Sequence, residues 1–188
     1  MKITAAAVLI TAVAGCFLFV EIIGSRRADN PGGIVWQTRE VIHGRINDSF
    51  GTGRVWIWRR GMRVILDRPV LGSGPDTFYY ALSDFQDEAI ELFGVRFDKA
   101  HNTFLQIAVC MGMPALLAYL VFLAGLLAPA LKAASNRPLL AAFCAAVLSY
   151  LIQSFFQIDT PIDKPILWAA LGVVAGEIRR DTKSTTNA

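Results

Sequence analysis

Two groups of side chains in this sequence could do chemistry. Three arginines, Arg54, Arg59 and Arg63, lie close together in one polar stretch. A guanidinium presents a fork of N–H donors that matches the oxygens of a phosphate, so these residues are candidates for holding a phosphorylated ligand. The second group is His101 with Asn102. A histidine ring titrates near neutral pH and can take a proton from a hydroxyl group.

The elements around these residues determine where they lie. Between residues 53 and 67, apolar and charged residues recur at helical spacing on opposite sides, which predicts an amphipathic helix. The apolar side is Val55, Trp58, Met62, Ile65 and Leu66, and the charged side is Arg59, Arg60, Arg63 and Asp67. This helix is expected to end at Arg68, because a proline disfavours helical backbone in the residue before it.

Asn102 stands where the N-cap of the next helix belongs. That position would put His101 beside the positive end of a helix dipole, a place suited to an anion such as a diphosphate. Residues 103–111 are predicted to form an interfacial helix, because Gly112 and Pro114 interrupt the apolar run before a membrane crossing begins.

Several other polar features have plain structural explanations. Residues 77–93 are expected to hold one or two short helices, and the carboxylates there favour a solvated acidic helix over a catalytic pair or cation site. They are Asp84, Asp87, Glu88 and Glu91. Residues 72–74 (GSG) are predicted to form a structural turn rather than a phosphate cradle, since no strand precedes them and no lysine follows. Asp159 and Asp163 are predicted to face a cavity mouth and to pair with arginines.

Composition indicates a membrane protein. Apolar residues make up 54% of the 188 residues and charged residues 18%, and the mean hydropathy is +0.47, outside the range of soluble proteins. Segments 3–20, 104–131 and 139–156 carry no charge and are long enough to cross a bilayer of about 30 Å. Segment 166–176 is shorter and crosses if residues 161–165 lie at the interface. The predicted fold is an all-α integral membrane protein with about four transmembrane helices.

The distribution of positive charge predicts the topology. Short basic flanks read as cytoplasmic by the positive-inside rule, and they contain Lys2, Lys132, Arg137, Arg179, Arg180 and Lys183. Residues 24–102 then form one large extracytoplasmic loop, which begins with a linker at 24–33. The expected order is a transmembrane helix at 1–23, the loop, an interfacial and a transmembrane helix at 103–131, crossings at 139–156 and 162–177, and a tail at 178–188. The protein is expected to be multi-pass in the plasma (inner) membrane.

The first segment allows an alternative, because a lysine followed by an apolar run can also be a signal peptide. Residues 13–16 (VAGC) resemble the box at which bacterial lipoproteins are cleaved, but the apolar run continues to residue 23 and favours an uncleaved helix. Cys16, Cys110 and Cys144 all fall in apolar segments, so no disulfide framework or metal cluster is expected.

The candidate site residues also have structural alternatives. The arginines could form a solvated helix face that touches lipid phosphates, and His101 could be an ordinary residue at a helix start. Trp56 fits an aromatic belt at a membrane interface, with contact to carbohydrate as the minority interpretation. His43 has no such context and is expected at the surface.

Three pieces of the sequence, in this order, resemble the carboxy-terminal half of the O-antigen ligase and polymerase superfamily, over residues 50–176. The first is GRVWIW at 53–58, followed by PVLGSGPDTF at 69–78. The second is AHNTFLQ at 100–106 with Gly112 and Pro114. The third is YLIQSFF at 150–156 with PILW at 165–168 and Gly172. The order, the spacing and the predicted membrane placement agree together.

The resemblance implies a glycosyltransferase of the GT-C type that needs no metal and no cofactor. Its donor would be a polyprenyl-diphosphate-linked glycan, its acceptor a lipid, a glycan or a protein on the outer membrane face, and no nucleic acid is expected as a partner. By the matching motifs, Arg54 would bind the diphosphate with Arg59 or Arg63 as helpers. His101 would activate the acceptor hydroxyl or steady the departing diphosphate, and Asn102 would orient the site.

The chain departs from the superfamily in one respect. Members carry many more membrane helices than the few predicted here. The chain is therefore expected to be a fragment of a longer gene product, one part of a split protein with a separate amino-terminal half, or a degenerate remnant. A non-catalytic membrane protein that binds lipid-linked glycans or scaffolds an assembly complex is the rival hypothesis.

Overall fold

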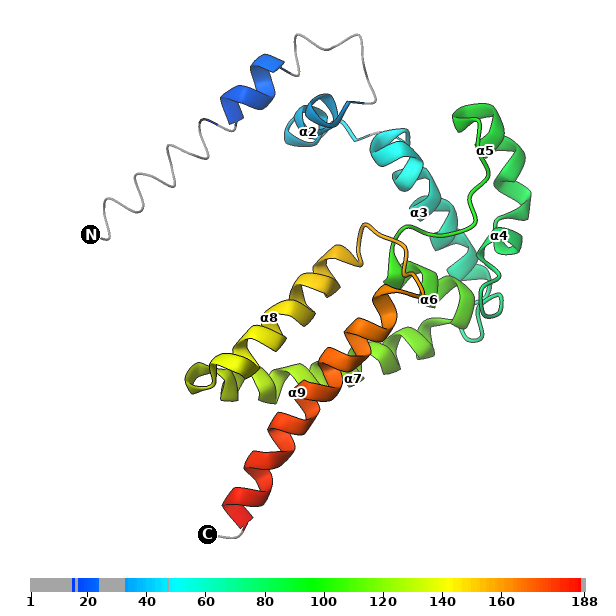
Figure 1. Cartoon of the computed structure of the whole chain (residues 1–188). Helices are drawn as coiled ribbons and strands as arrows, with labels where there is room; N and C mark the ends of the chain where they lie inside the picture. The colour runs from blue at the N-terminus through cyan, green and yellow to red at the C-terminus, as the bar shows by residue number, and fades with distance from the viewer. Residues whose placement is uncertain (1–14, 16, 24–32, 47, 187–188) are drawn as a thin grey trace. The chain divides into compact units, whose positions relative to one another are not determined.

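The computed structural model describes residues 15, 17–23, 33–46 and 48–186. Within these residues every regular element is a helix (Figure 1), which confirms the predicted all-α class. The chain divides into two compact units, residues 1–57 and 58–188. Residues 24–32 of the predicted linker and most of the predicted first membrane helix, including residues 13, 14 and 16 of the VAGC box, lie outside the described residues.

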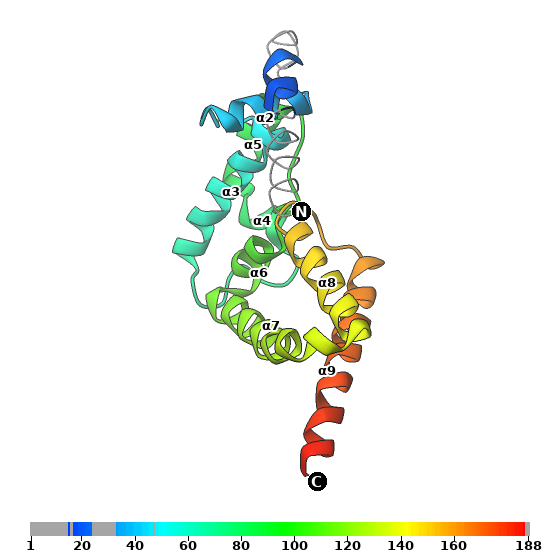
Figure 2. The same ribbon diagram turned by 90° about the vertical axis from the view of Figure 1, so that its left-hand side faces the viewer.

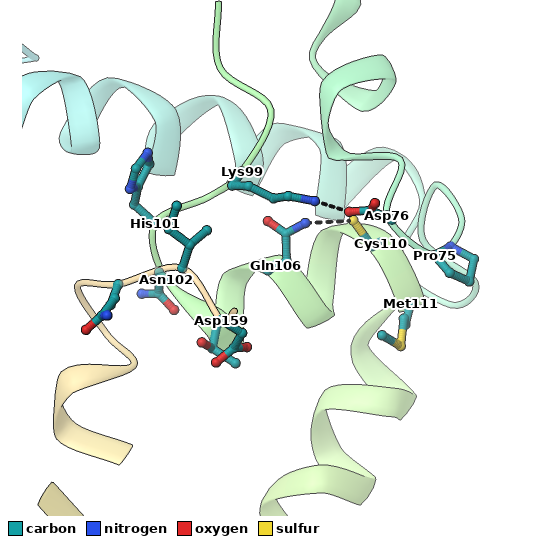
Figure 3. A pocket seen from close by; sticks show the side chains of 12 residues that line it. Pro75, Asp76, Lys99, His101, Asn102, Gln106, Cys110, Met111 and Asp159 are labelled. Carbon is teal, nitrogen blue, oxygen red and sulfur yellow. Dashed lines mark hydrogen bonds and ion pairs between the residues drawn. The ribbon is translucent and has the colours of Figure 1, made fainter. Parts of the chain in front are cut away.

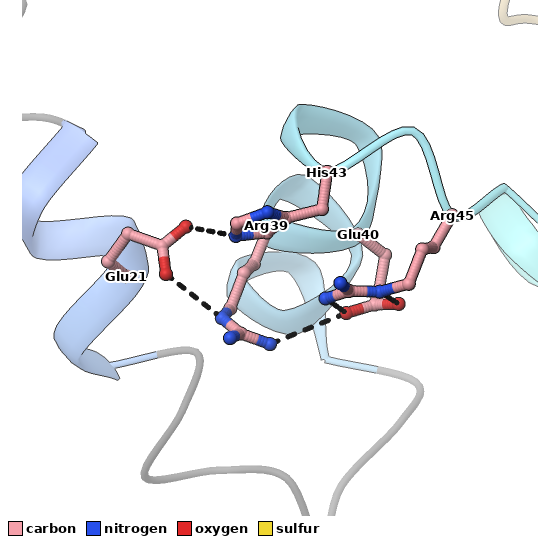
Figure 4. A network of polar contacts seen from close by, with 5 residues as sticks. All are labelled: Glu21, Arg39, Glu40, His43 and Arg45. Atoms are coloured by element: carbon pink, nitrogen blue, oxygen red, sulfur yellow. Dashed lines mark hydrogen bonds and ion pairs between the residues drawn. The ribbon is translucent and has the colours of Figure 1, made fainter.

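The first unit is held by ion pairs between short helices. Residues 17–23 are helical and are followed by α2 (Ile34–Ile42). One oxygen of Glu21 accepts a hydrogen bond from Arg39 Nε at 3.1 Å, and the other lies 2.7 Å from His43 Nε2 (Figure 4). Arg45 donates two hydrogen bonds of 2.8 Å to Glu40. Helix α2 was not predicted from the sequence. His43 follows its last residue and has 36% of its side chain accessible, in agreement with the predicted surface position.

The ion pair of Glu40 should make the first unit sensitive to acid. Hydrogen bonding from Arg45 lowers the pKa of Glu40 below its ordinary value of 4.5. A carboxyl with a lowered folded-state pKa stabilises the fold above its unfolded-state pKa, and this contribution is lost as the pH falls through the folded-state value. Relative to the unmodified protein, Glu40→Gln is expected to speed amide exchange in residues 39–46 at pH 7 but not at pH 3, as measured by hydrogen–deuterium exchange.

The matched control is Glu91→Gln, which removes an exposed carboxyl in the second unit. This control should leave the exchange of residues 39–46 unchanged at both pH values. An equal acceleration by Glu40→Gln at pH 3 and pH 7 would show that the charge of Glu40 is not what stabilises this segment.

The arginine-rich helix α3 (Phe50–Asp67) belongs to both units. Gly51, Thr52 and Gly53 have positive φ values of 65°, 59° and 87°, so the chain kinks there and the regular helix begins at Arg54. It ends at Asp67, one residue before the predicted end at Arg68. The predicted helix is therefore confirmed from Arg54 to Asp67, with Gly53 in the kink before it.

The buried side of α3 differs from the predicted apolar side. Met62 and Leu66 are 52% and 75% exposed, whereas Val64 is buried together with Ile65. The cause is Gly61, where a Cβ atom would lie 3.2 Å from a methyl group of Leu105. A glycine at this position lets the following helix approach closely, so α3 turns its glycine side inward and not the side richest in apolar residues.

Three short elements connect α3 to the rest of the second unit. They are α4 (Phe78–Ala81), a 3-10 turn at Ser83–Phe85, and α5 (Gln86–Phe93). They match the prediction of short helices with an acidic second member, and Glu88 of α5 pairs with Arg60 of α3 at 2.5 Å. The buried Gln86 side chain binds both backbone groups of Phe97, at 2.8 and 3.1 Å. This contact anchors the segment that leads to His101.

Four apolar helices complete the second unit: α6 (Thr103–Met111), α7 (Met113–Ala133), α8 (Pro138–Gln153) and α9 (Asp163–Thr186). The last three lie side by side in both views (Figures 1 and 2). Leu123 and Leu127 of α7 pack with Val147 of α8 and with Leu167 and Leu171 of α9. The predicted boundary between α6 and α7 at residues 112–114 is confirmed. Helix α9 extends to Thr186, into the segment predicted to be a cytoplasmic tail at 178–188, and the side of the membrane on which that tail lies stays a prediction.

The outer surfaces of these helices are apolar, as contact with lipid requires. Leu117 and Val121 of α7 and Ile152 of α8 are each more than 60% exposed. Among the described residues, one helix, residues 113–136, is both long and apolar enough to cross a membrane. Helix α8 is apolar but shorter, and α9 carries charged residues at both ends. The four predicted crossings therefore stay a prediction.

The two ends of this helical bundle are chemically different. At one end the Arg137 guanidinium contacts the Glu177 carboxylate at 2.5 Å, close to Arg179 and Arg180 in the sequence. At the other end the amide of Thr103 donates to the carbonyl of Ser154 at 2.8 Å, which places the start of α6 beside the end of α8. His101 thus lies at the end of the bundle away from the basic flanks, as the predicted threading requires.

Candidate functional site

The turn that carries His101 has an unusual backbone conformation. His101 has φ of +49°, in the left-handed region that few residues other than glycine enter, although histidine does so more readily than most. The flanking Ala100 is held by two side chains: Trp58 donates from Nε1 to its carbonyl at 2.9 Å, and Gln106 accepts from its amide at 2.8 Å. A residue kept in such a conformation by its surroundings is typical of functional sites.

Asn102 caps α6 as predicted. Its Oδ1 accepts a hydrogen bond from the Leu105 amide at 3.0 Å. The amide of Thr103 donates to Ser154, and that of Gln106 donates to the carbonyl of Asn102 at 2.9 Å. Three amides of the first helical turn are therefore already bound within the chain. The start of α6 therefore has fewer free N–H donors for an anion than the sequence suggested, because these three amides already donate within the chain.

The glycine-rich turn closes the opposite end of α6. The amides of Ser73 and Gly74 donate to the carbonyls of Val109 and Cys110, at 2.9 and 2.8 Å. These carbonyls belong to the last turn of α6, where the helix itself supplies no N–H donors for them. Because its amides are used in this way, the turn cannot cradle a phosphate, and the prediction of a structural turn is confirmed.

Two glycines allow this close contact. A Cβ atom on Gly72 would lie 2.6 Å from the backbone of residues 109 and 110, and one on Gly112 would lie 2.1 Å from the Val70 carbonyl oxygen. Both glycines have positive φ, of +64° and +85°. The amide of Met113 also donates to the Pro69 carbonyl at 2.8 Å, so the turn and the junction between α6 and α7 form one contact.

A cavity of about 340 Å³ opens beside the His101 turn (Figure 3). It is formed by the glycine-rich turn, the segment before α6, one side of α6 and the connection from α8 to α9. His101 lies at one end, and Asp76, Cys110 and Met111 lie at the other. The lining residues are Pro75, Asp76, Lys99, His101, Asn102, Thr103, Gln106, Cys110, Met111, Gln157, Ile158 and Asp159.

The charged groups of the cavity are largely paired. Lys99 forms an ion pair with Asp76. Asp159 accepts a hydrogen bond from the Tyr150 hydroxyl at 3.0 Å and forms an ion pair with Lys164 at 2.8 Å. Asp159 thus faces the cavity as predicted, but its cationic partner is a lysine. Asp163 accepts from the Thr160 hydroxyl at 2.8 Å. The expected pairing with an arginine is wrong for Asp159, because the first turn of α9 supplies Lys164 instead. For Asp163 the pairing stays a prediction.

The predicted arginines are distributed over both units. Arg59 and Arg63 are exposed on α3 in the second unit, and neither lines the cavity. Arg54 belongs to the first unit, where its Nε atom is buried and has no hydrogen-bond partner among the described residues. Trp56, in the same unit, is only 1% exposed. Its proposed contact with carbohydrate stays a prediction, as does the meeting of Arg54 with His101.

Three polar residues of the cavity had no predicted role: Thr103, Gln106 and Gln157. The sequence does contain one signal for two of them. Thr103, Gln106 and Cys110 are spaced at i, i+3 and i+7, which places them on one side of α6. Among the described residues, no cluster of three or more histidine, cysteine, aspartate and glutamate side chains is arranged to hold a metal ion.

Helical structure and an apolar helix long enough to cross a membrane are typical of the class of helical membrane proteins. Residues 1–120 match the family model described as O-antigen ligase, and the chain belongs to this family. A search of curated proteins finds no match. The match contains the first two sequence motifs and also residues 1–49, for which no motif was recognised. The third motif, from residue 150, lies beyond it.

Proposed function

We propose that the chain is the transfer part of a membrane glycan ligase or polymerase in cell-surface polysaccharide biosynthesis. The donor is a polyprenyl-diphosphate-linked glycan, and the acceptor is a lipid or glycan on the outer face of the inner membrane. Membership of the O-antigen ligase family supports this proposal. The observation that carries it further is the His101 turn, whose left-handed backbone lies beside a cavity at the bundle end away from the basic flanks.

The residues divide the reaction between them. Arg54, with Arg59 or Arg63, holds the diphosphate and offsets the negative charge that grows as the diphosphate departs. His101 takes the proton from the acceptor hydroxyl. The hydroxyl oxygen then forms a bond to the anomeric carbon of the donor sugar, while the bond from that carbon to the diphosphate breaks. Asn102 acts through the backbone, because its side-chain oxygen is engaged in capping α6.

The proposed multi-pass topology has about four crossings, near residues 1–23, 113–131, 139–156 and 162–177, and an extracytoplasmic loop at 24–102. Cysteine labelling tests it, with the three native cysteines replaced by alanine. Leu71→Cys, at a position 82% exposed, should react with a membrane-impermeant maleimide in intact cells. Arg180→Cys, with a side chain 80% exposed, should react only after permeabilisation. Labelling of Leu71→Cys from the cytosol alone would overturn the topology.

A second candidate is a non-catalytic membrane protein that binds lipid-linked glycans or scaffolds an assembly complex. It is favoured by the described residues containing one helix that is long and apolar enough to cross a membrane, because the enzymes that the sequence resembles carry many more membrane helices. Transfer from a labelled donor separates the two candidates. Activity of membranes that contain the chain, alone or with a separately expressed amino-terminal half, supports the enzyme. Glycan binding without turnover in either preparation supports the scaffold.

A further inference from the structure

The cavity beside His101 is poorly suited to a diphosphate. Its lining contains two carboxylates, Asp76 and Asp159, against one ammonium group, Lys99, and that ammonium group is already paired with Asp76. No arginine lines it. The amides of Thr103, Leu105 and Gln106 at the start of α6 donate within the chain, as described above. Both carboxylates are paired with lysines, so an anion in this cavity would find no unpaired lysine or arginine in the lining and few free donors.

One buried hydroxyl in the cavity wall has no hydrogen-bond partner. Thr103 is 3% exposed, and its Oγ1 atom is buried without a partner among the described residues. Buried hydroxyl groups in folded proteins are nearly always hydrogen-bonded, and leaving one unpaired destabilises the fold. Thr103 lines the cavity, so a ligand can supply the missing partner once a small movement of the wall exposes the Oγ1 atom.

Other polar groups of the cavity retain hydrogen-bonding capacity. The side-chain amide nitrogens of Asn102 and Gln157 have no acceptor among the described residues, although the Gln157 oxygen accepts from Gln153. Each oxygen of Asp159 has one partner and can accept a second bond. These donors and acceptors stand among apolar groups such as Ile158 and Met111. Neutral, hydroxyl-rich ligands are bound by such mixed sites, in pockets of about 300 Å³ and above.

We propose that this cavity is the acceptor subsite and that it binds a neutral sugar. Thr103, Gln157 and Asp159 bind the hydroxyl groups of that sugar and present one of them to His101. The diphosphate of the donor is left to the arginines outside the cavity. The identity of the ligand as an acceptor rests on the proposed transfer function, whereas the preference for a neutral sugar over a phosphate rests on the lining of the cavity alone.

Methyl resonances of methionine give a direct measurement. The whole chain is labelled with ¹³C-methyl methionine, placed in lipid nanodiscs and titrated with methyl glycosides of glucose, galactose and N-acetylglucosamine, and separately with inorganic pyrophosphate. Met111 lines the cavity and should shift saturably with at least one glycoside and not with pyrophosphate. Its signal is assigned with Met111→Leu. No shift with any glycoside, or a saturable shift with pyrophosphate, would overturn the proposal.

Two variants of the cavity wall sharpen the measurement. Thr103→Val keeps the shape of the side chain and removes its hydroxyl, so the glycoside should bind about tenfold more weakly, as expected for one lost hydrogen bond. The melting temperature should not fall, because an unpaired buried hydroxyl is removed as well. Gln157→Ala, in the connection between α8 and α9, should also weaken glycoside binding several-fold. Unchanged affinity in both variants would contradict the assignment of these residues.

The control is Thr38→Val, the same substitution at an exposed threonine of α2 outside the cavity. It should leave glycoside affinity unchanged. The binding measurement is independent of turnover, so the two proposals fail separately. Saturable glycoside binding in a chain that transfers no glycan, alone or with a separately expressed amino-terminal half, would overturn the proposed enzyme function but support the sugar subsite. Glycan transfer without glycoside binding at Met111 would support the enzyme function but overturn the sugar subsite.

Discussion

Replacing His101 with asparagine is expected to cut transfer of the donor glycan by about 10²–10⁴-fold, the usual contribution of a general base. Asparagine is the informative replacement because His101 has φ of +49°, a conformation that asparagine tolerates better than other residues with a side chain. The turn held by Trp58 and Ser154 should then persist. The loss of transfer can therefore be assigned to the missing imidazole. Turnover in membranes containing the protein, alone or with a separately expressed amino-terminal half, gives the result, and the melting temperature reports on the fold.

Alanine at the same position tests the backbone argument. His101→Ala removes the imidazole and also places an ordinary residue in a left-handed conformation, which costs about 1–2 kcal/mol. Its melting temperature should be lower than that of His101→Asn, while the loss of transfer should be similar. If both variants kept the melting temperature and the transfer activity of the unmodified protein, His101 would be an ordinary residue at the start of a helix.

Substitutions of Arg54 test the proposed diphosphate-binding residues. Arg54→Lys keeps the positive charge but loses the forked geometry, so transfer should fall about tenfold or more, and Arg54→Ala should lower it further. The matched control is Arg68→Lys, the same change at an exposed arginine that follows α3. This control should retain full activity. Unaltered turnover in the Arg54 and His101 variants together would defeat the assignment of both residues.

Local signals in the sequence predicted much of the second unit. The helix of α3, the Asn102 cap and the break between α6 and α7 all depend on residues within a few positions of one another. Proline 69 ends α3, and Gly112 separates two apolar helices, as their intrinsic backbone preferences require. These features could be read from the sequence because no distant contact decides them.

Features that depend on distant contacts were predicted poorly. The prediction that Met62 and Leu66 lie on the buried side of α3 was wrong. Gly61, which has no side chain, allows Leu105 of α6 to approach a different side of the helix. The periodicity of apolar residues shows that a helix has two sides, but it does not show which neighbour will cover each of them. The role of Thr103 was missed for the same reason, since its missing partner is visible only in three dimensions.

The three motifs acquire a common structural meaning around α6. Trp58 of the first motif binds the carbonyl of Ala100, and Ser154 of the third motif accepts from the amide of Thr103. The glycine-rich turn binds the carbonyls at the other end of the helix. The first motif thus contacts the residues at both ends of α6, and the third motif contacts its start, next to His101. The residues of the three motifs can therefore act by positioning His101, and not only by direct contact with a substrate.

Replacing Gly112 with alanine should destabilise the second unit by about 3 kcal/mol or more, the cost of a positive φ plus overpacking against backbone. The new Cβ atom would lie 2.1 Å from the Val70 carbonyl oxygen, with φ of +85°. A backbone atom cannot swing aside as a side chain does, so the contact between the glycine-rich turn and α6 must open. The expected measurement is a large fall in melting temperature in detergent, with loss of protection from amide exchange in residues 69–74.

Gly72→Ala should have a similar effect, because its Cβ atom would lie 2.6 Å from the backbone of Val109 and Cys110 in the same contact. Once the contact has opened, the second substitution has little left to disrupt, so the double variant should be less destabilised than the sum of the two single variants. Gly125→Ala and Gly172→Ala are the controls: both glycines are helical with no atom within 4 Å of the added Cβ. There alanine should stabilise the helix by up to about 1 kcal/mol. Equal effects at Gly112 and Gly125 would mean that the docked turn does not hold α6 in place.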